Sequence, residues 1–171
     1  MNSSGLPVAM ALAASIAILV SGAGVSLADG TAEVARAIQE QYNAKNDAIA
    51  KKDIAAVWKI RTKDYTDVND GIVRGATELQ SKQARLFEMA TSLQATSTVE
   101  SVTLNGKTAV VRVRESGTIV MRNPQTKQDV ILKSEGYWLE TWVMDGRKWL
   151  TSQSKGITNA ITVNGKRMPP G

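Results

Sequence analysis

The second half of the chain reads as one β-strand after another, and this pattern constrains the fold most strongly. Between Ser92 and Lys155 the alternating segments are joined by the dipeptides Asn105-Gly106 and Asp145-Gly146, which favour tight hairpin turns. The first half has the apolar spacing of helices instead. Helices followed by a long antiparallel sheet predict an α+β fold in which a curved sheet wraps around helices and forms one pocket.

Composition excludes several chemistries. The chain of 171 residues contains no cysteine and no histidine. The first absence rules out disulfides, thiolate nucleophiles and thiolate zinc sites, and the second rules out a Ser-His-Asp triad and imidazole metal ligands. Acid–base catalysis would therefore need a carboxylate, a tyrosine or a lysine with a shifted pKa. No acidic run indicates a metal site and no motif indicates a cofactor, so we expect neither.

The N-terminal segment has the features of a secretory signal peptide. Residues 1–28 carry no ionisable side chain, and the apolar run from Val8 to Val20 is short for a membrane span. Small residues near its end suit cleavage after Ala28. We therefore expect a secreted or periplasmic protein without stable membrane insertion after cleavage. An uncleaved anchor that extends to Ala28 is the alternative, which two glycines in the segment disfavour.

The charge pattern argues against a nucleic-acid partner. The chain has 21 basic and 16 acidic residues and a formal net charge of +5. A basic protein invites a nucleic-acid hypothesis. The basic residues are nevertheless scattered, and the adjacent pairs are Lys51-Lys52, Arg147-Lys148 and Lys166-Arg167. We interpret the charge as a solvated surface.

A long amphipathic helix is predicted over residues 31–52, followed by a shorter helix. Apolar side chains recur there at helical spacing, namely at Val34, Ile38, Tyr42 and Ile49. Lys45 and Asn46 fall where this stripe should continue, so one polar side chain is expected to face inward or lie at the edge. Asp53 is a good N-cap for the second helix, which carries Trp58 and extends its apolar side toward Arg61.

A small hairpin and a third helix are predicted next. Asp70-Gly71 separates two short alternating segments, which places Tyr65, Asp67 and Asn69 on one face. Thr77 and Gln80 then match a capping box at the start of a helix.

The turn at Asn105-Gly106 predicts a register for the first two long strands. It sets Val102 opposite Ala109. Val111, Val113 and Glu115 then share a covered face with Thr98 and Glu100, whereas Arg112 and Arg114 point outward beside Val99.

The remaining strands leave one register open. The strand over residues 129–144 alternates between two faces, one of which carries Trp138, Glu140, Trp142 and Met144. At Asp145-Gly146, a two-residue loop sets Trp142 opposite Trp149, and a three-residue loop sets Val143 there. The last strand is expected to end near Lys155. We therefore assign the domain to residues 29–156 and a weakly held tail to residues 157–171.

This order of elements resembles the nuclear transport factor 2-like superfamily, in particular its exported branches related in shape to ketosteroid isomerases and polyketide cyclases. The resemblance covers residues 31–155 and is carried by three segments, Lys52 to Trp58, Asp64 to Gly71, and Thr141 to Ser154. It implies a conical half-barrel, with three N-terminal helices packed in the concavity of a curved, mostly antiparallel sheet. It also implies an apolar pocket and a homodimer formed through the outer sheet face.

The resemblance and the strand pattern together suggest candidate site residues. In the isomerase branch, a base lies in the first strand, and a tyrosine with a protonated aspartate forms an oxyanion hole. Asp67 lies near the position of the base. Glu140, between two tryptophans in the sequence, lies roughly where the resemblance implies the second acid. These two are therefore the candidate catalytic residues. The expected pocket residues are Tyr42, Asn46, Trp58, Tyr65, Glu115 and Gln153.

Three functions remain open from the sequence. The leading hypothesis is an exported, non-catalytic or weakly catalytic module that binds a hydrophobic small molecule. The first alternative is an isomerase, cyclase or dehydratase in which Asp67 removes a proton and Tyr42 or Glu140 stabilises the oxyanion. The second is a protein-interaction module that uses the outer sheet face.

Overall fold

The computed structural model describes residues 27–169, so the predicted signal peptide lies almost entirely outside the described residues. The helices are α1 (Leu27–Ala50), α2 (Ile54–Trp58) and α3 (Ala76–Met89). The strands are β1 (Arg61–Asn69), β2 (Ile72–Gly75), β3 (Ala90–Asn105), β4 (Thr108–Arg122), β5 (Asp129–Asp145), β6 (Lys148–Val163) and β7 (Lys166–Arg167).

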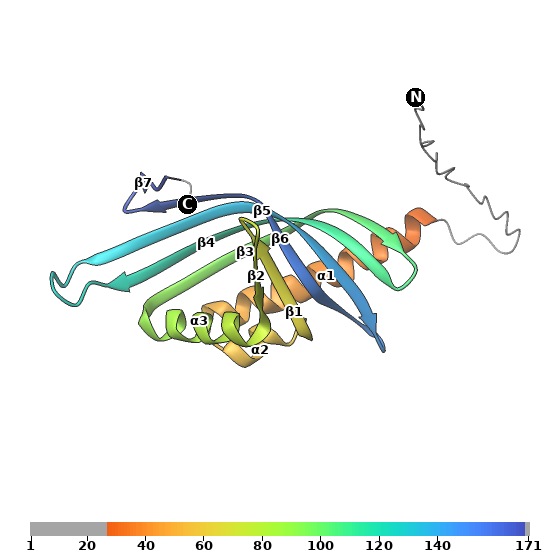
Figure 1. Cartoon of the computed structure of the whole chain (residues 1–171), viewed down its shortest axis with the longest axis horizontal. Coiled ribbons are helices and arrows are strands. Elements are labelled where there is room, and N and C mark those ends of the chain that lie inside the picture. Colours follow the sequence, from red (N-terminus) through yellow and green to blue (C-terminus); the bar gives the residue numbers. More distant parts are fainter. Residues whose placement is uncertain (1–26, 170–171) are drawn as a thin grey trace, which may run out of the picture.

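One curved sheet organises the molecule. Its strand order is β2-β1-β6-β5-β4-β3, with β7 paired to β6, and every pair is antiparallel except β1 with β6. Figure 1 shows the long strands bending over α1, while α2, α3 and the β1–β2 hairpin lie on the same side. The predicted α+β cone is confirmed.

The helix signals in the sequence were right in one case and wrong in another. The carboxylate of Asp53 accepts a hydrogen bond from the backbone N–H of Ala56 at 3.0 Å, which confirms the predicted cap of α2. The predicted capping box is wrong. The cap of α3 is Gly75, whose extended backbone starts the helix without a side-chain bond, so Thr77 already lies inside the helix.

The first hairpin register differs from the predicted one. Asn105 pairs with Thr108, so Gly106 and Lys107 form the loop and Val102 lies opposite Val111. A bulge next to Val99 then reverses the alternation of β3. Val99 therefore shares the covered face with Val113, whereas Glu100 lies on the outer face and forms an ion pair with Arg112 at 3.1 Å.

The second hairpin adopts neither of the two expected registers. Asp145 pairs with Lys148, so Met144 lies opposite Trp149. The last strand also continues past its predicted end. β6 pairs with β5 as far as Val163, opposite Leu132, so residues 157–163 belong to the sheet and do not form a loose tail.

The core lies between α1 and the inner face of the sheet. Ile38, Tyr42, Val111, Val113 and Trp142 are all fully buried there. A second apolar cluster joins the C-terminal part of α1 to α2, α3 and β3. The sheet is therefore covered on its inner face, which confirms the predicted covered face of β4.

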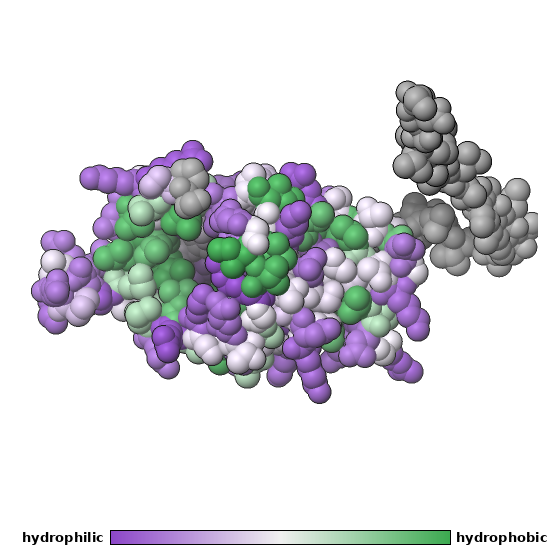
Figure 2. All heavy atoms as spheres, viewed as in Figure 1, coloured by the Kyte–Doolittle hydropathy of each residue, from purple (hydrophilic) through white to green (hydrophobic). Residues whose placement is uncertain are grey.

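Apolar side chains also remain on the surface. Figure 2 shows them gathered over the left-hand part of the sheet and again near the β1–β2 hairpin. On β2, Ile72 is 54% exposed and Val73 is 64% exposed, and on the outer sheet face Val110 and Leu139 are about two-fifths exposed. In the part of the chain described, no helix is long and apolar enough to cross a membrane.

Candidate functional site

A hydrogen-bond network centred on Glu140 occupies the interior of the cone. The Glu140 carboxylate on β5 is 6% exposed. It accepts a bond from the Tyr42 hydroxyl on α1, one from the Trp142 indole N–H at 2.9 Å, and one from the Ser154 hydroxyl on β6 at 2.7 Å. All three donors come from the covered side of their elements. The buried carboxylate therefore has hydrogen-bond partners in place of water.

A buried ion pair lies beside this network. Lys45, at the polar break in the helical stripe, turns inward and forms an ion pair with Glu115 on β4. The Ser97 hydroxyl bonds to the same carboxylate oxygen at 2.9 Å and also contacts the Asn46 amide oxygen at 3.2 Å. The prediction that one polar side chain of α1 faces inward is confirmed, and that side chain is Lys45.

The two glutamates have opposite electrostatic environments. Burial alone would raise the pKa of Glu115, but the Lys45 charge and the bonds from Lys45 and Ser97 outweigh it, and its pKa is lowered. Burial and the charge of Glu115 raise the pKa of Glu140. Burial and the neighbouring Glu140 carboxylate also raise the pKa of Tyr42 well above its ordinary value. Tyr42 therefore stays a neutral hydrogen-bond donor.

An arginine at the start of β1 packs into the corner formed by two nearly perpendicular aromatic rings. The Arg61 guanidinium carbon lies 4.2 Å from the centre of the Trp58 ring and 4.9 Å from that of Tyr65. The two rings themselves meet edge to face, with centroids 5.9 Å apart. Because each ring presents its π face to the cation, the stack fixes the side chain in place.

The side chains around Arg61 line a cavity of about 320 Å³ under α3. Its walls combine apolar groups with a few polar ones, which is typical of small-molecule pockets. The lining residues are Trp58, Arg61, Tyr65, Asp67, Leu79, Lys82, Gln83 and Leu86. Gln83 accepts a bond from the Trp58 indole at 2.8 Å, which ties the aromatic wall to α3.

Asp67 lies inside this cavity and is not free in solvent. Its side chain is 20% exposed, and the nearest Arg74 nitrogen is 3.9 Å away. Burial raises the pKa of Asp67, partly offset by the charges of Arg74 and Arg61. Burial also raises the pKa of Tyr65 to about 12, although Arg61 opposes this shift.

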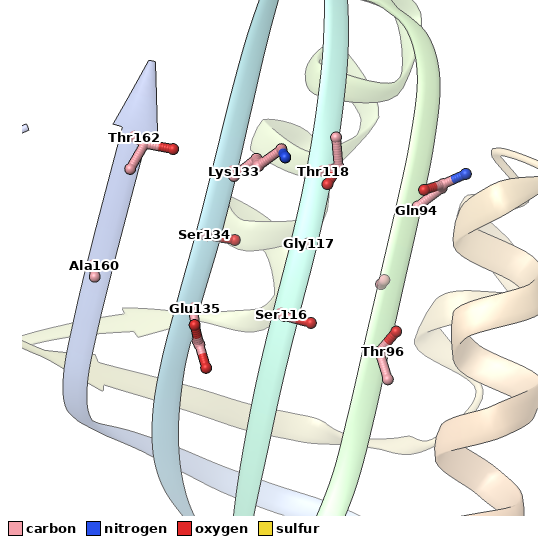
Figure 3. Close-up of a pocket in the computed structure, with 11 residues that line it drawn as sticks. Gln94, Thr96, Ser116, Gly117, Thr118, Lys133, Ser134, Glu135, Ala160 and Thr162 are labelled. Atoms are coloured by element: carbon pink, nitrogen blue, oxygen red, sulfur yellow. The ribbon is translucent and has the colours of Figure 1, made fainter. Parts of the chain in front are cut away.

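A second cavity, of about 440 Å³, lies on the outer face of the sheet. Figure 3 shows its lining side chains rising from β3, β4, β5 and β6, with short hydroxyl groups predominating. Its one carboxylate, Glu135, already forms an ion pair with Arg114. This groove has no aromatic wall, so the cavity under α3 is the better candidate site.

The structure divides seven of the eight predicted site residues into two groups. Trp58, Tyr65 and Asp67 line the cavity under α3. The other group belongs to the interior network, where Tyr42 contacts Glu140, and Asn46 and Glu115 meet at Ser97.

The expected place of Gln153 in the pocket is wrong. Trp142 pairs with Thr151 and Thr141 pairs with Gln153, so Ser152 is an extra residue in β6. This bulge reverses the alternation, and Gln153 lies exposed on the outer face while Ser154 points inward to Glu140.

Sequence reasoning missed the role of Arg61. The sequence pattern places it only at the end of the apolar side of the second helix, yet it begins β1. Its neighbours Trp58 and Tyr65 in the sequence were the available signal, since an arginine flanked at short range by aromatic residues often stacks on them. The inward hydroxyls of Ser97 and Ser154 gave no comparable signal.

No family model matches the chain, and no curated protein matches it. The likeness to solved structures is clear in shape and weak in sequence. A conserved protein from Planctomyces limnophilus DSM 3776 superposes with a TM-score of 0.64 and 14% identity, covering 72% of this chain and 94% of that chain. An NTF-2-like protein of unknown function from Shewanella oneidensis MR-1 superposes with a TM-score of 0.50 and 11% identity. The match covers 71% of this chain and 96% of that chain. The chain has an NTF-2-like fold.

Structures with this NTF-2-like fold include enzymes as well as proteins of unknown function. A hexachlorocyclohexane dehydrochlorinase (LinA) type 2 superposes with a TM-score of 0.58 and 14% identity, covering 82% of this chain and 96% of that chain. At such identities the likeness establishes the fold alone. The function must therefore be argued from the residues of the site.

Proposed function

We propose that the protein is an exported module that binds a small, largely apolar molecule in the cavity under α3, without catalysis or with weak catalysis. The observation that carries this proposal is the composition of the cavity wall. Trp58, Tyr65, Leu79 and Leu86 all line it, and the Arg61 guanidinium packed on the rings provides a polar group for orientation. A concave wall with aromatic and leucine side chains beside a few charged groups favours a ligand with an apolar body.

The arrangement of the acid–base groups favours binding over catalysis. Asp67 is the pocket carboxylate, but Tyr42 and Glu140 bond to each other within the core and do not line the cavity. The hydroxyl proton of Tyr42 is directed to Glu140. A proton abstraction by Asp67 would therefore lack the tyrosine and acid pair that the isomerase resemblance implies.

A pocket-filling variant tests the proposal. Native mass spectrometry of protein purified from its own envelope fraction should reveal a retained small molecule on the wild type. Leu79→Trp fills the cavity and should abolish this extra mass. The matched control Thr118→Trp fills the outer groove and should leave it unchanged. Equal retention by the Leu79→Trp and wild-type proteins would contradict the proposal.

A second candidate function is catalysis by Asp67. The observation that favours it is the position of this carboxylate, which is largely desolvated in the pocket with a raised pKa and so suits a general base. The expected reaction class is isomerisation, cyclisation or elimination from an apolar substrate. If this function holds, Asp67→Asn should lower turnover of such a substrate by at least about 100-fold while binding persists. Unchanged turnover would exclude it.

We also propose that the outer sheet face supports a homodimer. Val110, Ile131 and Leu139 are each about two-fifths exposed on this face, and apolar side chains on a sheet surface favour association. Light scattering should give twice the mass of the mature chain, and Leu139→Lys should give the monomer mass. A wild-type monomer would contradict the dimer and favour docking of another protein.

A further inference from the structure

We propose that Arg61 binds the carboxylate, or a similar planar anion, of an otherwise apolar ligand. This inference rests on the proposed binding function and specifies its ligand class. The cavity under α3 would therefore recognise an amphipathic organic acid, with its anionic end at Arg61 and its apolar body against Leu79 and Leu86.

The guanidinium of Arg61 has no hydrogen-bond acceptor among the described residues. Its Nε and Nη1 atoms are buried and unpartnered, and no ion pair joins it to a carboxylate of residues 27–169. Buried donors without acceptors are rare in folded proteins, and a water, an ion or a functional role commonly accounts for them. The missing acceptor is therefore best supplied from outside the chain.

Other arginines of the fold are satisfied within it. Arg112 pairs with Glu100, Arg114 with Glu135, and Arg122 with Asp129, all on the exposed surface. Arg74, at the edge of the pocket, lies 3.9 Å from both Asp67 and Glu78. Arg61 differs from these four because it packs into the corner of two rings and has no carboxylate within ion-pair distance among the described residues, although Asp67 lines the same cavity.

The geometry of the stack suits a planar anion. The rings of Trp58 and Tyr65 lie against the guanidinium carbon, so an anion would meet the N–H edge of the group, and the wall beside the buried Nε and Nη1 atoms must move as the ligand enters. Those groups form a rigid fork that matches the two oxygens of a carboxylate. Beside buried aromatic rings, such a charged bond is stronger than it would be in water.

The charges around the cavity favour the same ligand class. Arg61, Arg74 and Lys82 oppose Asp67 and Glu78, and Lys82 at the rim is bound to Glu78 at 2.6 Å. The cavity and its rim therefore carry one more positive than negative charge, and the Arg61 charge also acts on the Glu115 carboxylate in the core. The chain as a whole carries a formal charge of +5, which draws small anions toward it.

A matched pair of probes tests the inference. 2-Naphthoate and 2-naphthamide share one apolar body and differ in the anionic group, and isothermal titration calorimetry measures the affinity of each. Wild-type protein should bind naphthoate roughly 10- to 100-fold more tightly than the amide, as expected for one bidentate charged contact. Arg61→Met keeps the apolar stem, so it should retain the amide affinity and lose this preference.

Two further variants complete the design. Arg114→Met removes a surface arginine outside the cavity and should keep the wild-type preference. Arg61→Lys keeps the charge without the fork and should give an intermediate preference. Circular dichroism melting curves verify that each variant is folded.

The outcomes separate the two proposals. Two results would overturn the anion site: equal wild-type affinity for the two probes, or an unchanged preference for naphthoate in Arg61→Met. Either result would leave the proposed binding pocket intact, and a bound water would then be the partner of Arg61. Binding of neither probe would contradict the proposed binding function together with this inference.

Discussion

The hydroxyl of Tyr42 on α1 donates a hydrogen bond to the carboxylate of Glu140 on β5, and both side chains are buried at the centre of the cone. The bond links the longest helix to the middle of the sheet. It also directs two groups that would be useful in acid–base chemistry toward each other and away from the cavity under α3. These residues join α1 to the sheet, and the polar groups that line the cavity are instead Arg61, Asp67, Lys82 and Gln83.

Tyr42→Phe should destabilise the protein. The change removes one of three donors to a buried carboxylate without a large change in volume, so the free energy of unfolding should fall by about 1–3 kcal/mol. Urea denaturation measures this. Tyr137→Phe is the matched control, because the Tyr137 ring stacks on Arg112 at the outer face and its loss of a hydroxyl should cost less than about 0.5 kcal/mol. Equal effects of the two changes would contradict the role given to Tyr42.

Glu115→Gln and Glu140→Gln should have opposite pH dependences. The lowered pKa of Glu115, in which Lys45 outweighs burial, means that its ionised form stabilises the fold. This contribution is present above the ordinary glutamate pKa and is lost as the pH falls through the lowered value. The pKa of Glu140 is raised, chiefly by burial, so its protonated form is the one that favours the fold. The contribution of Glu140 to stability is therefore lost as the pH rises from the ordinary glutamate pKa through the raised pKa.

Urea denaturation across about pH 3 to pH 8 measures both effects. The stability deficit of Glu115→Gln should grow with pH and reach about 3 kcal/mol at neutral pH, because Lys45 is then left buried without its partner. The deficit of Glu140→Gln should shrink as the pH rises. Parallel pH profiles for the two variants would show that the electrostatic account of the network is wrong.

Gly136→Ala should be poorly tolerated. A Cβ atom at this position on β5 would lie 2.3 Å from the backbone oxygen of Thr158 and 2.8 Å from the Trp138 ring. Since a backbone atom cannot move aside cheaply, we expect a loss of about 2–3 kcal/mol in thermal or chemical unfolding. Gly30→Ala in α1 meets no atom within 4 Å and should stabilise the helix by up to about 1 kcal/mol.

Asp67→Asn should strengthen binding of an anionic probe. The Asp67 carboxylate shares the cavity with Arg61 and repels a second negative charge there. Its removal should tighten naphthoate binding by roughly 3- to 10-fold and leave naphthamide binding unchanged, as calorimetry would show. A weaker affinity for naphthoate in Asp67→Asn would mean that Asp67 positions Arg61 or the ligand.

The element order was predictable because it depends on local signals. Apolar spacing located α1, the Asp53 carboxylate capped α2, and Asp70-Gly71 marked the β1–β2 turn. The alternation of β5 also placed Glu140 and Trp142 on the covered face. Each of these features is decided within a few residues of the chain.

The parts that failed depend on strand pairing over longer range. The extra residue at Ser152 exchanges the faces of Gln153 and Ser154, and the bulge beside Glu100 does the same for β3. The alternation of a single strand does not predict such an extra residue, because its position depends on the pairing with the neighbouring strand. The stacked position of Arg61 likewise depends on how α2 meets β1.

The binding cavity itself can be tested most directly by nuclear magnetic resonance. A titration of the ¹⁵N-labelled protein with 2-naphthoate reports which residues the probe approaches. We predict shifts of the Trp58 indole signal and of the amide signals of Arg61, Leu79 and Leu86, with Thr118 and Lys133 on the outer groove unmoved. Shifts confined to the outer groove, or absent altogether, would contradict the assignment of the site to the cavity under α3.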